Sequence, residues 1–374
     1  MIIFIIPSFT LGGVETQTYN LCREFISQGY RVGVVVTRGG KGPLFGKLEK
    51  LGVECHFFNE FNGFSRFPFF KKFRVLFRFV FFLRSLKPTV LIPFTEPINI
   101  AVNAVWRFTG AKKCFFTMRG GTPIGGSFTR LFPLVRILKP TAFVSNSQNG
   151  ARVMEDFLKL KPGLFKVIPN GVFLNPPLNS SEFWRTMLDI DASDYVFIMI
   201  GNYYPEKNHE VLLRAFHSLV TNHHPVRAKL ILCGDKSNFD RQYLYIKSLI
   251  LDLKLYGRVR LIESTNDISG LLKIAHCGIL LSYSEGCPNA VLEYMMAGIP
   301  FLGSDIPAIR EVVPENYPFL VSNEDAVEVE DKLLQISSLS TEEAQALGTA
   351  LSQRVNSNYN YSNLVNSWKE LIHS

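Results

Sequence analysis

Two carboxylates, Glu285 and Glu293, are the side chains in this sequence best placed to bind a ligand. Glu285 follows an apolar run at residues 278–284, which predicts a buried strand. Glu293 lies within a predicted helix, four residues after Asn289 and therefore on the same helical face. In open α/β sheets, ligands bind beyond the carboxyl ends of the strands, which is where we expect Glu285. Such carboxylates accept hydrogen bonds from hydroxyl groups; the alternative is two solvated surface glutamates.

The segment around these carboxylates has the signals of a strand–loop–helix–strand unit. Gly286 interrupts the first strand, and Pro288 suits the first position of a helix because its φ is already helical. Gly298 suits the helix end, and a second apolar run at residues 301–305 predicts the next strand. The start of such a helix offers peptide N–H groups and the positive end of a dipole to an anion. The unit therefore fits an anionic ligand that also carries sugar hydroxyls.

The composition indicates a well-packed globular chain with more than one domain. The sequence has 374 residues, of which 47% are hydrophobic, and this length exceeds one ordinary hydrophobic core. Its six cysteines are scattered without a C-x-x-C pair, which favours a reducing compartment and argues against a zinc site or a disulfide framework. Residues 1–7 predict a buried first strand rather than a signal peptide, and no apolar run approaches the length of a membrane span.

Positive charge is concentrated in one part of the chain. Residues 61–154 contain fifteen Lys and Arg but a single acid, Glu96, so this stretch carries a formal charge of +14 against +8 for the whole chain. Such a field attracts phosphate-bearing partners or an anionic membrane surface. Nucleic acid fits poorly, because no nucleic-acid-binding motif accompanies the charge.

Residues 66–87 combine this charge with many phenylalanines at helical spacing. One interpretation is a helix at the membrane interface, whose Phe side chains enter the lipid while Lys and Arg meet the head groups. The alternative is an ordinary core helix with a basic solvent face. We expect the interfacial helix, because no acid offsets the charge between Phe61 and Thr95. The residues expected to meet the membrane are Phe69, Phe73, Phe77, Lys71, Lys72, Arg74 and Arg78.

Predicted strands and helices alternate along the chain, which indicates parallel sheets covered on both faces. The expected fold is α/β, with two doubly wound Rossmann-like domains facing a cleft. We expect these domains at residues 1–178 and 179–356, and an amphipathic helix at 357–374 that packs back on the first domain. The strand-like runs lie at residues 2–6, 31–37, 53–58, 89–93, 113–118, 142–145, 166–169, 195–201, 227–234, 259–262, 278–284 and 301–305.

Several motifs within this frame resemble the glycosyltransferases of family 4, which have the GT-B fold. They are Gly12-Gly13 with its neighbours after the first strand, Val144-Ser-Asn-Ser-Gln-Asn-Gly150, Lys166-Val-Ile-Pro-Asn-Gly171, residues 201–209, and Glu285-x7-Glu293. The resemblance covers the whole chain. It implies retaining transfer of a sugar from a nucleotide donor, UDP-linked in our interpretation, without a metal or another cofactor. It also implies that the first domain binds the acceptor and the second binds the donor.

The resemblance assigns roles to particular residues. Lys207 is expected to bind the departing diphosphate, Glu285 the donor sugar, and Glu293 the ribose, with Lys207 and Glu285 as the catalytic residues. Two positions depart from the family pattern, since Asn202 stands where an Arg is usual and Arg119 where many relatives have a His. Arg119 is the expected acceptor-side residue, and an Arg cannot serve as a base. The implied donor-binding residues are Gly12, Gly13, Asn202, Lys207, Glu285, Gly286, Cys287, Pro288, Asn289 and Glu293.

Residues 262–268 end a predicted strand and lead into a predicted helix. They fit backbone contacts to a uracil-like base, and they fit equally well a helix start capped by Thr265 or Asp267. Both interpretations stay open.

We therefore expect a cytoplasmic enzyme that is peripheral on the cytoplasmic face of the membrane. It would move a hexosyl or N-acetylhexosaminyl group from a nucleotide sugar to a lipid-linked glycan acceptor in bacterial surface polysaccharide assembly (O-antigen, capsule or exopolysaccharide). The expected partners are the nucleotide sugar, the acceptor and the anionic inner-membrane surface, with no nucleic acid. Two alternatives stay open: a nucleotide-sugar epimerase of the same fold, and a non-catalytic membrane-bound scaffold derived from a transferase.

Overall fold

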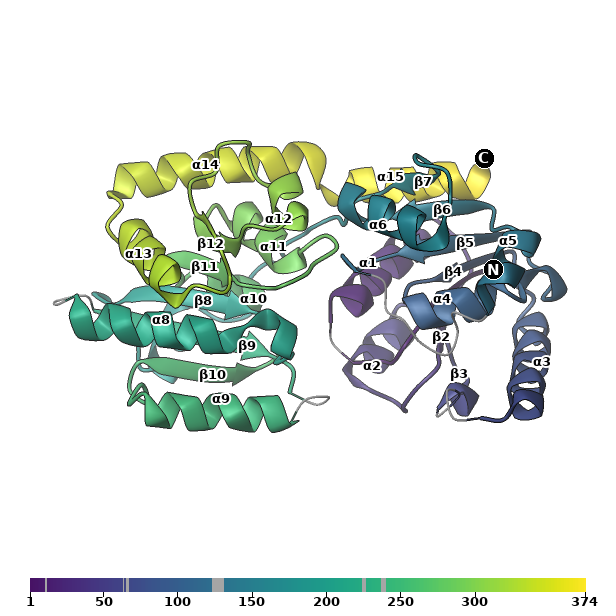
Figure 1. The fold of residues 1–374 in the computed structure, drawn as a ribbon, viewed down its shortest axis with the longest axis horizontal. Helices are drawn as coiled ribbons and strands as arrows, with labels where there is room; N and C mark the ends of the chain where they lie inside the picture. Colours follow the sequence, from purple (N-terminus) through teal and green to yellow (C-terminus); the bar gives the residue numbers. More distant parts are fainter. Residues whose placement is uncertain (11, 63, 65–66, 123–130, 224–226, 237–239) are drawn as a thin grey trace. The chain divides into compact units, whose positions relative to one another are not determined.

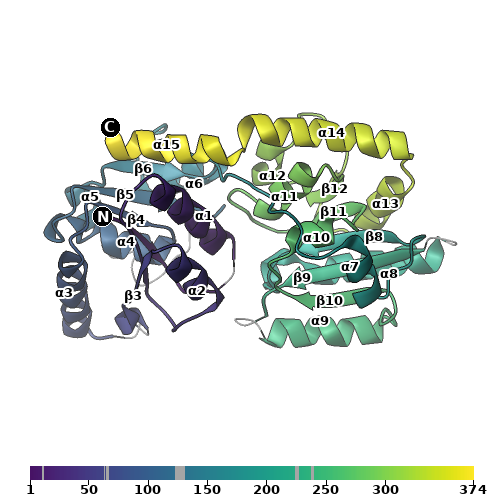
Figure 2. The same cartoon turned by 180° about the vertical axis from the view of Figure 1, so that it is seen from behind.

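The protein consists of two compact units, each with its own parallel sheet. The computed structural model describes residues 1–10, 12–62, 64, 67–122, 131–223, 227–236 and 240–374. Unit 1 contains Met1–Asn170 and Ser362–Ser374, and unit 2 contains Gly171–Tyr361. Figures 1 and 2 show the elements of each unit from opposite sides. The sequence predicts the first boundary at residue 178, so the first unit ends earlier in the chain than predicted.

Unit 1 is built on a seven-stranded sheet in the order β3-β2-β1-β4-β5-β6-β7, and the paired strands are parallel. The chain starts in the middle of the sheet, winds to one edge and then returns to extend the other, which makes the sheet doubly wound. The central strands are continuous apolar runs because helices cover both faces. The strands are β1 (Ile2–Ile6), β2 (Val32–Val36), β3 (Glu54–Phe57), β4 (Val90–Pro93), β5 (Lys113–Met118), β6 (Ala142–Ser145) and β7 (Phe165–Val167).

The helices of unit 1 bury one face each against this sheet. Helix α1 begins at Gly13 with Gly12 at its N-cap, so Gly13 is the first helical residue and not part of the turn. It places Leu21, Cys22 and Phe25 in the core at helical spacing. The described helices are α1 (Gly13–Ser27), α2 (Pro43–Lys50), η1 (Asn59–Phe61), α3 (Phe69–Ser85), α4 (Glu96–Asn103), η3 (Trp106–Phe108), α5 (Phe132–Leu138) and α6 (Gln148–Leu158).

The C-terminal helix α15 (Tyr361–His373) completes the core of unit 1, to which its residues from Ser362 onward belong. Trp368 on this helix is fully buried. Its ring centre lies 5.9 Å from that of Phe94 and 5.7 Å from that of Phe115. Truncating a buried Trp typically costs about 3–5 kcal/mol, so α15 contributes substantially to the stability of unit 1.

Unit 2 is built on a six-stranded sheet in the order β10-β9-β8-β11-β12-β13, again with parallel pairing. The chain of this unit also starts in the middle of its sheet, at β8. The edge strand β13 has only two residues, and the sequence gives no periodic signal for it. The strands are β8 (Tyr195–Ile200), β9 (Ala228–Gly234), β10 (Val259–Glu263), β11 (Cys277–Leu280), β12 (Phe301–Ser304) and β13 (Leu320–Val321).

Helices cover both faces of the second sheet, with α13 packed beside α8 and α14 beside α11. Helix α11 ends at Gly298, which takes the predicted stop position with a φ of 69°. Helix α14 approaches it so closely that a Cβ on Gly348 would lie 1.9 Å from the Gly298 carbonyl oxygen. The described helices are α7 (Ser181–Met187), η5 (Pro205–Lys207), α8 (His209–Asn222), α9 (Asp240–Asp252), α10 (Ile268–Leu272), α11 (Asn289–Ala297), α12 (Pro307–Val312), α13 (Ala326–Ser337) and α14 (Thr341–Asn358).

One carboxylate, Asp267, ties the beginning of unit 2 to the start of helix α10. It accepts hydrogen bonds from the N–H groups of Leu178 at 2.8 Å and Asn179 at 3.0 Å, and from the Trp184 indole at 2.8 Å. It also caps α10 by accepting from the N–H of Gly270 at 3.1 Å, as one interpretation of this segment predicts. Burial acts to raise the pKa of Asp267, but the hydrogen bonds outweigh it and hold the pKa below its ordinary value.

Candidate active site

The second sheet has its topological switch point between β8 and β11. From β8 the chain continues to β9 and β10 on one side, and then returns to place β11 on the other. Strands β8 and β11 pair in parallel, with Phe197 opposite Cys277 and Met199 opposite Ile279. Their carboxyl ends therefore lie together, which is where open α/β sheets bind their ligands.

The loops that follow β8 and β11 are tied to each other at this point. The N–H of Tyr283 donates to the carbonyl of Glu206 at 3.0 Å. The Asn323 side chain donates to the carbonyl of Ser282 at 2.8 Å, and the Asn208 side chain donates to the carbonyl of Asn323. These bonds fix both loops against the end of the sheet.

Lys207 and Glu285 meet between these loops. The Nζ atom of Lys207 lies 2.5 Å from Oε1 of Glu285, and the two side chains are only 20% and 15% exposed. Lys207 ends the 3₁₀ turn η5, and its aliphatic stem packs over Gly201, where an added Cβ would lie 3.6 Å from it. Both residues are expected site residues, and the structure joins them in an ion pair that the sequence does not predict.

Glu293 lies on the next helix, α11, and has no hydrogen-bond or ion-pair partner within the described ranges. Burial removes water from its carboxylate and raises the pKa to about 7. Burial and, to a smaller extent, the Glu293 charge raise the pKa of the Cys233 thiol at the carboxyl end of β9. A carboxyl with a pKa near 7 exists in both protonation states at neutral pH, so it can either donate or accept a hydrogen bond.

Tyr294, next to Glu293, fixes α11 to both strands at the switch point. Its hydroxyl donates to the carbonyl of Ile279 in β11 at 3.1 Å and accepts from the N–H of Ile200 in β8 at 2.8 Å. The ring fills the space above Gly278, where an added Cβ would lie 2.4 Å from ring carbons. Sequence reasoning missed Tyr294; the available signal is a tyrosine in an otherwise apolar helix after a strand that contains a glycine.

The loop before α11 is buried at Gly286, Cys287 and Pro288. The helix begins at Asn289, and Pro288 is its N-cap with a φ of −76° and a ψ of 103°. The predicted first helical position of Pro288 is therefore wrong by one residue, because its ψ is extended. The Pro288 carbonyl still accepts the first helical hydrogen bond, from the N–H of Leu292 at 3.1 Å.

Asn202 follows β8 and joins two neighbouring loops. Its side-chain oxygen accepts a hydrogen bond from the N–H of Asp235, after β9, at 3.1 Å. The two strand ends approach so closely that a Cβ on Gly234 would lie 2.0 Å from the Gly201 carbonyl oxygen. Asn202 thus holds the loops after β8 and β9 together, and its expected contact with the donor stays a prediction.

His209, directly after this segment, is neutral at physiological pH. Burial and, secondly, the charge of Lys207 lower the pKa of His209 to about 3. Its ring stacks on the buried ring of Tyr203 at 5.3 Å. An imidazole with such a pKa is too weak a base to take a proton during catalysis at neutral pH.

In unit 1, Arg119 follows β5 and holds several chain segments at the carboxyl edge of the first sheet. Its guanidinium donates to the Asn170 side chain at 2.8 Å and lies 4.5 Å from the ring centre of Phe94. The Asn146 side chain donates to the Arg119 carbonyl at 3.3 Å. Asn146 and Asn170 belong to two separate motifs of the sequence, and the structure brings both to Arg119.

Helix α3 of unit 1 has two apolar faces, one buried and one exposed. The buried face consists of Val75, Phe79 and Leu83. The exposed face recurs at helical spacing, with side chains between 55% and 85% exposed, and consists of Phe70, Phe73, Phe77 and Phe81. Phe73 and Phe77, two of the residues predicted to meet a membrane, lie on this exposed face. The side chain of Phe69 lies outside the described part of the structure.

Basic residues surround the exposed Phe face of α3. Lys71, Arg74 and Arg78 are exposed, and Lys72 is half-buried. One acid approaches them, since Arg78 pairs with Glu60 at 2.9 Å. Within the described residues, no helix is both long enough and apolar enough to cross a bilayer.

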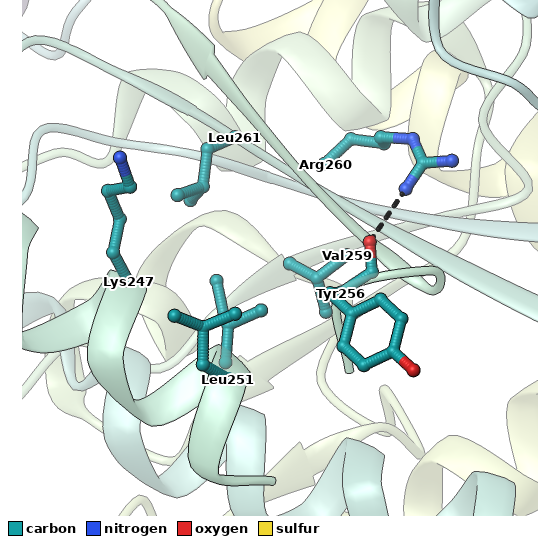
Figure 3. Close-up of a pocket in the computed structure, with 7 residues that line it drawn as sticks. Lys247, Leu251, Tyr256, Val259, Arg260 and Leu261 are labelled. Carbon is teal, nitrogen blue, oxygen red and sulfur yellow. Dashed lines mark hydrogen bonds between the residues drawn. The ribbon is translucent and has the colours of Figure 1, made fainter. Parts of the chain in front are cut away.

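A pocket elsewhere in unit 2 is separate from these residues. Figure 3 shows it between α9 and β10, lined by Lys247, Ile250, Leu251, Tyr256, Val259, Arg260 and Leu261. The dashed line marks a hydrogen bond from Arg260 to the Tyr256 carbonyl at 3.1 Å. The pocket begins at the amino end of an edge strand, whereas Lys207 and Glu285 follow carboxyl ends, and none of the predicted site residues lines it.

Comparison with known sequence families gives two matches, one in each half of the chain. Residues 11–175 match the family described as Glycosyltransferase Family 4, and residues 180–354 match the family described as Glycosyl transferases group 1. The chain belongs to glycosyltransferase family 4. Solved structures share the fold of this chain. Anabaena HepE in complex with UDP and glucose superposes with a TM-score of 0.82 over 100% of this chain and 99% of that chain, at 16% identity. A glycosyltransferase from Rickettsia africae gives 0.81 over 99% and 97%, at 19% identity. The family-4 chain therefore has the GT-B fold.

Two curated relatives match parts of this family-4 chain. An uncharacterized glycosyltransferase of Methanocaldococcus jannaschii is 24% identical over 263 residues, which are 66% of this chain and 63% of the relative. The UDP-Gal:alpha-D-GlcNAc-diphosphoundecaprenol alpha-1,3-galactosyltransferase of Escherichia coli is 31% identical over 153 residues, which are 40% of this chain and 38% of the relative. The chain thus spans less than two thirds of the length of both relatives.

Proposed function

We propose that this family-4 chain transfers a sugar from a nucleotide-sugar donor to a lipid-linked glycan acceptor, with retention of configuration at the transferred carbon. The observation that carries the proposal is the Lys207–Glu285 pair at the switch point of the second sheet. A ligand with both phosphates and sugar hydroxyls finds a partner for each group there. A UDP-linked donor is supported by the E. coli relative, which is named for UDP-Gal, and by HepE, which was solved with UDP. The transferred group would be hexosyl or N-acetylhexosaminyl.

The chemistry needs charge stabilisation at the leaving group. A nucleoside diphosphate departs as an anion, so a positioned cation matters more than a proton donor. We assign this role to Lys207, assisted by the peptide groups at the start of α11. Glu285 would accept hydrogen bonds from hydroxyls of the transferred sugar, and Glu293 would bind the ribose. Asn202 would add a neutral donor near the phosphates.

We assign acceptor binding to unit 1. Gly12 and Gly13, the implied donor-binding residues of this unit, would let the backbone approach the donor or the acceptor closely at the start of α1. Arg119 would face the acceptor side at the edge of the first sheet. Because Arg119 cannot take a proton, we propose that an oxygen of the departing phosphate receives the proton of the acceptor hydroxyl.

We propose that the reaction needs neither a metal nor another cofactor. Lys207 and the dipole of α11 together supply the positive charge that a divalent cation supplies in other phosphoryl chemistry.

We also propose that α3 binds the anionic cytoplasmic face of a membrane, where a lipid-linked acceptor is available. The support is its exposed face of Phe70, Phe73, Phe77 and Phe81 with basic residues around it. The Vi polysaccharide biosynthesis protein of Salmonella typhi, 26% identical over 183 residues, and the E. coli relative favour a role in bacterial surface polysaccharide assembly.

The activity is tested in two steps. A panel of nucleotide sugars is first screened for protection against thermal unfolding, which identifies the donor. Transfer to a synthetic lipid diphosphate sugar is then followed by mass spectrometry. We expect Glu285→Ala to reduce turnover by about 100-fold or more while the variant stays folded at the assay temperature. Glu206→Ala, which removes an exposed carboxylate from the same loop region, should keep full turnover.

Three outcomes would overturn this proposal. Near-normal turnover of Glu285→Ala would refute the site assignment. Conversion of the UDP-sugar in the absence of any acceptor would indicate an epimerase. Absence of UDP binding at millimolar concentration would indicate a non-catalytic scaffold.

The membrane proposal has its own test in co-sedimentation with phosphatidylglycerol vesicles. Combined replacement Phe73→Ser and Phe77→Ser should weaken binding about 100-fold, because each buried Phe contributes about 1.5 kcal/mol or more. Phe183→Ser, which changes an exposed Phe of unit 2, is the matched control and should bind as the wild type does. If vesicle binding does not change with lipid charge, with salt or with the two Phe replacements, α3 is an ordinary surface helix.

A further inference from the structure

The ion pair between Lys207 and Glu285 occupies the groups that the proposed donor needs. Each of these side chains is mostly buried, and neither has another hydrogen-bond or ion-pair partner in the described part of the chain. The carboxylate is therefore the counter-ion of Lys207 in this structure. A diphosphate that approaches Lys207 has to replace a carboxylate that is already in contact with it.

Within the described residues, Lys207 is the one side chain with which Glu285 forms a hydrogen bond or an ion pair. Its loop is fixed to the loop after β8 by the bond from Tyr283 to Glu206, and by the bonds that run through Asn323. A partly buried carboxylate that loses its counter-ion is costly, and repulsion from two phosphates adds to that cost. The separation of this pair therefore needs new hydrogen-bond donors for Glu285.

The hydroxyls of a transferable sugar are such donors, and free UDP has no sugar at this position. We infer that Glu285 competes with the diphosphate for Lys207, and that this competition discriminates the intact nucleotide sugar from the spent nucleoside diphosphate. The inference rests on the proposed function, because it takes Lys207 as the diphosphate ligand and Glu285 as the sugar ligand. With the intact donor bound, sugar hydroxyls compensate Glu285 while the diphosphate binds Lys207.

The same competition favours product release. When the sugar has moved to the acceptor, its hydroxyls leave Glu285, and the carboxylate is again without a partner. It then returns to Lys207 and displaces the diphosphate, with no proton or covalent bond changed in this step. Glu285 thus lowers the affinity for UDP while it raises the affinity for the UDP-sugar.

The test compares UDP binding to the wild type, Glu285→Gln and Glu206→Gln by isothermal titration calorimetry. Glu285→Gln keeps the shape of the side chain and removes its charge, so we expect it to bind UDP about tenfold more tightly than the wild type. Glu206→Gln removes the same charge from an exposed position nearby and should bind UDP as the wild type does. The preference for the UDP-sugar over UDP, large in the wild type, should shrink by at least the same factor in Glu285→Gln.

Glu285→Asp provides a second measurement if Glu285→Gln does not fold. It keeps the charge but shortens the side chain by one methylene, which weakens the contact with Lys207, so its affinity for UDP should lie above that of the wild type. UDP binding by Glu285→Gln or Glu285→Asp that is no tighter than wild-type binding would overturn the inference and leave the proposed function standing. Failure of the wild type and every variant to bind UDP would instead overturn the proposed function.

Discussion

Replacing Glu293 by Gln should stabilise unit 2 in a pH-dependent manner. Gln keeps the size of the side chain but cannot ionise. In the folded wild type, burial raises the pKa of Glu293 from 4.5 to about 7. The folded state therefore holds this proton more tightly than the unfolded state does, and stability falls as the pH rises from 4.5 through 7.

The magnitude follows from the two pKa values. A carboxyl group whose pKa moves from 4.5 to about 7 on folding loses about 3 kcal/mol of stability once the pH exceeds both values. Glu293→Gln does not lose this stability, because the Gln side chain does not ionise. The variant should thus match the wild type near pH 4.5 and exceed it by about 2–3 kcal/mol at pH 8.

Hydrogen–deuterium exchange of peptides from β8 and β11, read at pH 5, 6.5 and 8, measures this difference within unit 2. A local readout is preferable because a chain of two units need not unfold in one step. Glu206→Gln controls for the loss of one negative charge and should follow the pH trend of the wild type. Parallel curves for Glu293→Gln and the wild type across this pH range would refute a raised pKa of Glu293 in the folded protein.

Three further predictions concern the supports of the site and its chemistry. Gly278→Ala should destabilise unit 2 by about 3 kcal/mol in urea unfolding, because its Cβ would overlap the Tyr294 ring, and an unchanged midpoint would contradict that packing. Asp267→Asn should lower the free energy of unfolding by about 2 kcal/mol at pH 7, because hydrogen bonds to the charged carboxylate lower the pKa of Asp267. The difference in stability between this variant and the wild type should narrow as the pH falls below 3.8. A difference that does not change with pH would contradict the role of the Asp267 charge. Transfer should proceed at the same rate with and without EDTA, and a loss of rate that Mg²⁺ restores would refute the metal-free proposal.

Much of the fold could be predicted from local sequence patterns. Continuous apolar runs predict most of the buried parallel strands, because such strands are covered on both faces and need no polar alternation. The two-residue strand β13 is too short for a periodic signal. Unit 1 ends before the predicted boundary at residue 178, because the polar and Pro-rich segment after Asn170 is fixed to unit 2 by Asp267. That contact joins positions far apart in the chain, and no local pattern contains it.

The residues of the candidate site can likewise be predicted from local sequence, whereas their contacts with distant residues cannot. Lys207, Glu285 and Glu293 can be selected from their motifs and their places after strands. Three other features depend on tertiary packing and cannot be read from the spacing of residues. They are the ion pair, the elevated pKa of Glu293, and the hydrogen bonds by which Tyr294 joins α11 to the two strands. The buried face of helix α3 is also hard to predict from the sequence. The helix carries Phe on most sides, so two different faces could pack against the core equally well.

The place of α15 in unit 1 has a consequence for biosynthesis. Helix α15 follows the whole of unit 2 in the chain, so the ribosome makes Gly171–Tyr361 before Trp368 can cover Phe94 and Phe115. At about 5–20 residues per second, this delay is on the order of 10 to 40 s. During that time the nascent first unit carries an uncovered aromatic surface that chaperones or neighbouring chains can bind. The first unit can therefore complete its core only after the whole of unit 2 has been synthesised.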